Sequence, residues 1–307
     1  MAIKLNGKDL PKILFPTTRA RLREIGYETY HSRLISGICN IRFDKLAPSY
    51  STIDVFKASN NNSKPTVFYV SSTETSKKDR MRRGLSHFIA RDGFDVIALR
   101  CGIQFPRNVV ECLNALEWIQ NNKSKLGIDF SKVILAGDSI GGFALFSLVT
   151  AMSNPNYAAL LGIKPFTLNI VAESYFCGLF DIPRLYDAAN TRRDQRLINK
   201  MLRKFPIDFA EIKKSTIPTA LSPTAYMMET RSPIFVTHTD FDKLYATQGL
   251  YLIRAIHATN SPYYEVRAIK AAMKHNWQLN IKDNFGKSVL MCFGELMDIF
   301  IKVIWIY

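Results

Sequence analysis

The most informative segment of this 307-residue chain reads Val133-Ile134-Leu135-Ala136-Gly137-Asp138-Ser139-Ile140-Gly141-Gly142. Its four opening apolar residues predict a short buried strand, and residues Gly141–Met152 predict a helix. A serine on the sharp turn between such a strand and helix is exposed in a strained conformation. Small residues two before and two after it relieve the clash. Because Gly137 and Gly141 hold these places, the segment predicts a nucleophilic Ser139 at a strand-to-helix turn.

The same turn predicts one half of an oxyanion hole. A helix N-terminus presents N–H groups and the positive end of the helix dipole, and both stabilise a developing negative oxygen. The backbone N–H of Ile140 is the donor that this turn would supply. A serine hydroxyl is a poor nucleophile unless a base lies beside it. We therefore expect a histidine and an acid elsewhere in the chain.

Strand and helix patterns alternate on both sides of this segment. Strands are predicted at Ile53–Ala58, Thr66–Val70, Phe94–Leu99, Lys132–Ala136, Thr167–Ala172, Ile234–Thr237 and Tyr264–Ile269. Helices are predicted at Lys78–Ala90, Asn108–Gln120, Gly141–Met152, Tyr245–Ala258 and Ser288–Ile304. This alternation favours an α/β fold with a mostly parallel sheet and helices on both of its faces.

The domain organisation follows from where that alternation begins and lapses. Residues 51–307 are predicted to form the main domain, and residues 1–50 a partly helical segment packed on it. Between Tyr175 and Pro223 the strand pattern stops, and Arg192–Lys204 predicts a basic amphipathic helix. We therefore expect a small helical cap inserted at about residues 175–223.

From Pro65 onward the sequence resembles the α/β-hydrolase superfamily. The resemblance is to the carboxylesterase and lipase group, which includes hormone-sensitive-lipase-like esterases and their feruloyl-esterase-like and kynurenine-formamidase-like relatives. It rests on Gly137–Gly142, which matches the group's Gly-Asp-Ser-x-Gly-Gly motif at every position, on Ala115–Ala136 before it, and on Ala220-Leu221-Ser222-Pro223. It covers about Asp54 to Ile304. The resemblance implies an α/β-hydrolase fold and a serine esterase that forms an acyl-enzyme on Ser139.

The acid of a catalytic triad is expected after the strand that ends near Val236. In this fold the chain order is nucleophile, acid, histidine. The family has a His-Gly-x-x-Asp turn at this place, which implies Asp242 as the acid. Thr239 replaces the usual glycine, and Asp240 stays an alternative acid. His238 is expected to be a structural residue at the strand end.

The base is expected at His275, 33 residues after Asp242, as in the family. It follows the predicted strand Tyr264–Ile269 by a short loop. His275 would take the proton of Ser139 and return it to the leaving group, while Asp242 holds the imidazole in the required tautomer.

The second half of the oxyanion hole departs from the family pattern. Where the family has His-Gly-Gly after the strand equivalent to Thr66–Val70, this chain has Ser71-Ser72-Thr73-Glu74-Thr75. The second N–H would come from Ser72 or Thr73, whose β-carbons restrict the positive-φ conformations that glycine reaches easily. Loss of one donor slows such enzymes by about two to three orders of magnitude.

Several function classes stay open at this point. An ester hydrolase with reduced or specialised activity is one. A hydrolase-fold binding or interaction protein is another, and an amidase, thioesterase or acyltransferase with the same triad is a third. The expected substrate is a small-molecule or lipid-like acyl ester, and no cofactor or metal is predicted.

The chain is strongly basic, with 41 Lys and Arg against 26 Asp and Glu, a net charge of +15. Such a charge favours encounters with anionic partners, but no nucleic-acid-binding motif is present. The basic runs Lys77–Arg83 and Arg192–Lys204 are compatible with weak contact to an anionic membrane. Ordinary solvated helix faces account for them more simply. The sequence does not indicate an oligomeric state.

Cysteine usage and hydropathy favour a cytoplasmic protein. The five cysteines are scattered and form no Cys-x-x-Cys pair, which indicates reduced thiols rather than disulfides or a zinc site. The apolar stretch Val289–Tyr307 is interrupted by charges, so a packed last helix is expected rather than a membrane span. The first residues do not have the pattern of a secretory signal.

Overall fold

The computed structural model describes residues 35–44, 48, 50–58, 64–72, 76–91, 93–188, 192–202, 220–230, 232–239 and 248–268. The predictions for residues 1–34 and for the helix Ser288–Ile304 lie outside these ranges.

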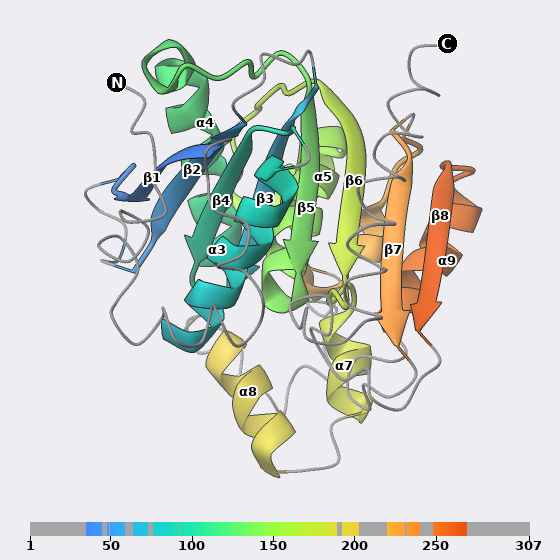
Figure 1. Cartoon of the computed structure of the whole chain (residues 1–307). Helices are drawn as coiled ribbons and strands as arrows, with labels where there is room; N and C mark the ends of the chain where they lie inside the picture. The colour runs from blue at the N-terminus through green and yellow to red at the C-terminus, as the bar shows by residue number, and fades with distance from the viewer. Residues whose placement is uncertain are drawn as a thin grey trace.

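The described strands form one eight-stranded sheet in the order β1-β2-β4-β3-β5-β6-β7-β8 (Figure 1). Their bounds are Ile35–Ile41 for β1, Thr52–Ala58 for β2, Thr66–Ser72 for β3, Val96–Cys101 for β4, Val133–Asp138 for β5, Ile170–Phe176 for β6, Ile234–Thr239 for β7 and Tyr263–Ala268 for β8. Strand β2 is antiparallel to β1 and β4, and the pairs from β4 through β8 are parallel. The predicted mostly parallel sheet is confirmed. The parallel strands therefore end at a common edge.

Helices cover both faces of this sheet. Their bounds are Ser76–Arg91 for α3, Arg107–Leu126 for α4, Ser139–Ser153 for α5, Pro155–Leu161 for α6, Ile182–Ala188 for α7, Arg192–Leu202 for α8 and Gln248–Ala258 for α9, with a 3-10 turn η3 at Pro223–Tyr226. Figure 1 shows α3 in front of the sheet and α4, α5 and α9 behind it. Helices α7 and α8 lie beyond the arrowheads, at the edge where the parallel strands end.

Helix α5 is the centre of the fold. Twelve of its 15 residues are buried, which explains why its sequence is apolar on all sides. It contacts β3 and β5 on one side and α4 and α6 on the other. A helix enclosed in this way has a fixed direction, so its first residue has a fixed position at the edge of the sheet.

Several elements differ from the predictions. Strand β1 and helices α6 and α7 were not predicted, and β6 begins at Ile170 rather than Thr167. Thr167 and Leu168 do not pair with the sheet but line a cavity. Bonding to the neighbouring strand begins at Asn169, whose carbonyl accepts a hydrogen bond from Val133 N–H at 2.9 Å. At its other end β6 continues through Phe176, two residues into the range expected for the cap.

The basic run Lys77–Arg83 is only in part a surface feature, which corrects its interpretation as a basic patch. Arg82 and Arg83 are buried, and both donate hydrogen bonds to the buried Asp54 carboxylate, at 2.7 and 2.6 Å. Arg83 also donates to the side chain of Asn40. Two of the run's charges therefore attach α3 to β1 and β2 and cannot contact a membrane.

The described helices include none that is long and apolar enough to cross a membrane. Within the same ranges, no three His, Cys, Asp or Glu side chains gather as a metal site, and no disulfide joins the four cysteines.

Candidate active site

Ser139 lies at a sharp turn between the end of β5 and the start of α5. Its φ is +52°, in the left-handed region that costs an ordinary residue about 1 to 2 kcal/mol. Asp138 before it is extended, with φ −121° and ψ 146°. The chain therefore changes from strand to helix within one strained residue, as the sequence predicted. Such strain persists only where the surrounding packing imposes it.

Two glycines make this turn sterically feasible. A β-carbon on Gly137 would lie 2.8 Å from the Cα of Gly142. The end of β5 and the first turn of α5 therefore contact each other through backbone atoms, with no side chain between them. A β-carbon on Gly141 would lie 2.5 Å from the carbonyl oxygen of Val70 in β3. Contacts below 3.0 Å are essentially never seen for real β-carbons. Both predicted glycine positions therefore require glycine.

The turn that follows β6 packs over the N-terminus of α5. Cys177 has a φ of +45°, and its N–H donates to the carbonyl of Thr237 at 2.7 Å. The N–H of Leu179 then donates to the carbonyl of Ser139 at 3.3 Å. As a result Ser139 is only 6% exposed, which corrects the exposed position expected from the sequence, and Ile140 is also buried. The turn that follows β6 therefore covers the serine.

Gln248, a residue that the sequence analysis did not identify, holds this covering turn. Its Oε1 accepts hydrogen bonds from the backbone N–H groups of Phe180 and Asp181, both at 2.9 Å, and its Nε2 donates to the Asp181 carbonyl. Gln248 is fully buried at the start of α9. The start of α9 is thereby tied to the turn over Ser139. A glutamine in a predicted helix offers no sequence signal for such a role.

Asp138 has a polar neighbour on the sheet. Burial, and then the charge and hydrogen bonding of Asp138, raise the pKa of Tyr69 well above its ordinary value. Tyr69 is on β3, where Ser71 stands opposite Asp138 in the parallel register. The raised pKa keeps the tyrosine neutral, and its hydroxyl interacts with the side chain of the residue that precedes Ser139.

The structure brings together some of the predicted site residues. Ser139 and Ile140 form the turn, and Ser72 is the last residue of β3, the neighbouring strand. Thr73, Asp242 and His275 lie outside the described residues, as does the alternative acid Asp240. His238 is buried on β7, and its ring fills the space where Gly249 lacks a side chain.

The strands that precede the predicted acid and base do end in the right place. Strand β7 ends at Thr239, three residues before Asp242, and β8 ends at Ala268, seven residues before His275. Both are parallel to β5, so they end at the same edge as the strand that precedes Ser139.

Comparisons with known proteins give related matches. A family model described as BD-FAE matches residues 54–253. An arylesterase of Saccharolobus solfataricus is 29% identical over 133 residues, 40% of this chain and 42% of that protein. A protein of Acanthamoeba polyphaga mimivirus named as an α/β hydrolase is 30% identical over 84 residues, 25% of this chain and 24% of that protein. The chain thus spans less than half the length of these curated relatives. Esterase B of Lactobacillus rhamnosis has a similar structure, with a TM-score of 0.74 and 14% identity over 95% of this chain and 96% of that one.

Proposed function

The chain belongs to the BD-FAE family, of the α/β-hydrolase type, and from this membership we propose that it is a serine hydrolase of carboxylic esters. The family membership confirms the resemblance found in Gly137–Gly142. The observation that carries the proposal is the left-handed Ser139, held between β5 and α5 by two obligatory glycines. A strained serine at a strand-to-helix turn is consistent with a nucleophile.

In the proposed reaction Ser139 Oγ attacks the ester carbonyl while His275 accepts its proton. Asp242 orients the imidazole and stabilises its charged form. The N–H of Ile140, with the N–H of Ser72 or Thr73, stabilises the oxyanion. The alcohol then leaves with the proton from His275, and a water molecule, deprotonated by the same residue, hydrolyses the acyl-enzyme.

Two features support the assignment of the acid and base. Asp242 and His275 follow β7 and β8 in the chain order of this fold, and both strands end at the edge where Ser139 lies. In addition, Gln248 lies six residues after Asp242 in the chain and ties the start of α9 to the turn over the serine.

The test is covalent labelling with a fluorophosphonate, combined with hydrolysis of p-nitrophenyl acetate. We expect Ser139→Ala to abolish both, and Ser222→Ala, a buried serine at the start of η3, to retain both. His275→Ala should lose activity, while His257→Ala, an exposed histidine on α9, should not. Asp242→Asn should lower turnover by about three to four orders of magnitude, whereas Asp240→Asn should change it little.

The alternative functions give different results in the same test. A folded wild type that is never labelled would favour the hydrolase-fold binding protein, for which the replaced His-Gly-Gly segment is the supporting observation. Labelling without ester turnover would favour an amide, a thioester or transfer to an acceptor other than water. Turnover that survives in Ser139→Ala would refute the proposal.

A further inference from the structure

A cavity of about 260 Å³ lies between the end of α5, the residues leading into β6 and the segment before β7. It is far from the proposed nucleophile, because Ser153 on its wall is the last residue of α5 and Ser139 is the first. At a rise of about 1.5 Å per residue, the two helix ends are roughly 20 Å apart. The ester-cleaving site therefore does not account for this cavity.

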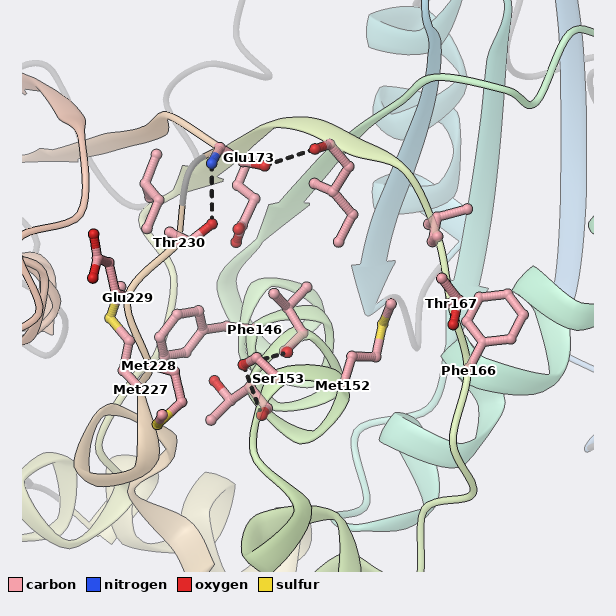
Figure 2. A pocket seen from close by; sticks show the side chains of 16 residues that line it. Phe146, Met152, Ser153, Phe166, Thr167, Glu173, Met227, Met228, Glu229 and Thr230 are labelled. Atoms are coloured by element: carbon pink, nitrogen blue, oxygen red, sulfur yellow. Dashed lines mark hydrogen bonds between the residues drawn. The ribbon is translucent and has the colours of Figure 1, made fainter.

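Most of the wall is apolar and adaptable. Figure 2 shows aromatic rings and thioethers around the space, contributed by Phe146, Phe166, Met152, Met227 and Met228. Methionine side chains are flexible and polarizable, so they adjust to ligands of different shape. The volume equals that of roughly nine water molecules at about 30 Å³ each. The cavity is therefore suited to a small apolar body.

One charged side chain enters this apolar space. Figure 2 shows the Glu173 side chain extending from β6 into the cavity, towards Phe146. Glu173 is 2% exposed, and the one hydrogen bond that the described residues give its carboxyl comes from the Tyr175 hydroxyl, at 2.5 Å. Burial raises the pKa of Glu173 to about 7, against the opposing effect of the Tyr175 hydrogen bond. A buried carboxyl normally has a cation or several donors beside it.

The sign of the charge on the wall is opposite to that of the whole chain. The exposed Glu229 adds a second carboxylate, and the described lining residues include no Lys, Arg or His. The chain as a whole carries a net charge of +15. An anionic ligand would meet two carboxylates here, whereas a cation would supply the positively charged partner that the described residues do not give Glu173.

We propose that this cavity binds a small organic cation, a protonated amine carried on an apolar body of fewer than ten non-hydrogen atoms. The ammonium group donates a hydrogen bond to the Glu173 carboxylate, and charge-assisted bonds of this kind are the strong ones. The apolar body packs against Phe146 and Met152, and an aromatic face also attracts a cation. The proposal is independent of ester hydrolysis, since it uses none of the residues at Ser139.

Calorimetry with benzylamine tests the proposal, with benzyl alcohol and benzoate as neutral and anionic probes of similar size. We expect benzylamine to bind at least tenfold more tightly than either. Glu173→Gln, which keeps the shape of the side chain, should weaken benzylamine binding at least tenfold. Glu229→Gln should change it less than threefold. Ser153→Trp, a bulky replacement at an exposed position on the wall, should abolish it.

A pH series separates the ionic contact from simple filling of an apolar space. Among the described residues, the other titratable groups are Tyr175, which is hydrogen-bonded to Glu173, and Glu229, which lies on the cavity wall. With a pKa of about 7 for Glu173, the ionised fraction rises about tenfold from pH 6 to pH 8, and benzylamine affinity should rise with it. Binding near pH 7 should also release protons, measured as a dependence of the heat on the buffer.

Three results would overturn the proposal. They are no benzylamine binding by the folded wild type, equal affinity for benzyl alcohol, and unchanged benzylamine affinity in a Glu173→Gln variant that melts at or above the wild-type temperature. Labelling of Ser139 by a fluorophosphonate, measured on the same samples, tests the hydrolase assignment separately.

Discussion

Gly141 stands so close to β3 that a β-carbon on it would lie 2.5 Å from the carbonyl oxygen of Val70. The nucleophile turn is therefore held by backbone-to-backbone contact between the first turn of α5 and the neighbouring strand. Neither partner can move away easily, because α5 is enclosed on both sides and Val70 is fully buried.

Gly141→Ala should abolish labelling of Ser139 and lower the melting temperature. Alanine is the better helix former by about 1 kcal/mol, so helix propensity alone predicts the opposite change in stability. Gly162→Ala serves as the control, since it places a methyl group in open space at a left-handed position remote from Ser139. It should cost about 1 kcal/mol and leave labelling intact. Normal labelling of Gly141→Ala would contradict the packing argument.

Gln248→Ala should reduce ester turnover more than its effect on folding accounts for. The substitution leaves the buried N–H groups of Phe180 and Asp181 without their acceptor, a loss of about 2 to 4 kcal/mol. It also loosens the turn that covers Ser139. Asn154→Ala removes the N-cap of α6 and loses about 1 kcal/mol away from the site. Turnover is measured at a temperature where both variants are fully folded, and equal turnover would count against the proposed role of Gln248.

Asp54→Asn should destabilise the fold by about 3 to 5 kcal/mol, because two buried guanidinium groups lose their anion. Burial opposes ionisation of Asp54, but Arg82 and Arg83 hold its pKa below the ordinary value. A lowered pKa contributes stability above the unfolded-state pKa of about 4, and this stability is lost as the pH falls through the folded-state pKa. Thermal melts from pH 7 to pH 3 should show a smaller acid loss in Asp54→Asn than in wild type.

Glu173→Gln should make the protein more stable at pH 8. Burial raises the pKa of Glu173 from 4.5 to about 7. Between these values the folded state holds a proton that the unfolded state has released. Wild-type stability therefore falls by about 3 kcal/mol as the pH rises from 4.5 to 7. The variant lacks this dependence. The free energy of unfolding in urea is measured for both proteins across this pH range. If it changes with pH equally in both, the Glu173 carboxyl ionises normally and the prediction is wrong.

Vesicle binding tests the membrane prediction for the basic run in α8. Ile198 and Met201 on its apolar face are buried, and the Met201 carbonyl accepts a hydrogen bond from Phe105 N–H at 2.9 Å. The apolar face is therefore used within the protein, and Arg196 and Lys200 on the outer face are exposed. We expect weak binding to anionic vesicles only, lost at high salt. Reversing both charges should weaken it at least tenfold, and equal binding to neutral vesicles would refute this expectation.

The strand-to-helix turn at Ser139 could be predicted from the sequence because its requirements are local. A short apolar run, a serine and two glycines at fixed spacing together determine the conformation of about ten residues. The same holds for most strands and helices, whose periodicity is visible within a single window. Strand β1 and helix α7 were not predicted, because their periodicity within a single window is weak.

The roles of charged and polar residues depended on the tertiary structure. Arg82 and Arg83 look like part of a solvated basic run until β2 places Asp54 beside them, and Gln248 looks like an ordinary helical residue until the turn after β6 meets it. Glu173 lies one residue beyond the predicted strand Thr167–Ala172 and gives no sequence signal, and the cavity it enters is built from segments up to 88 residues apart, from Phe146 to Ile234. Local patterns determine backbone conformation because they act between neighbours in the chain. Burial and charge pairing act between residues that only the folded chain brings together.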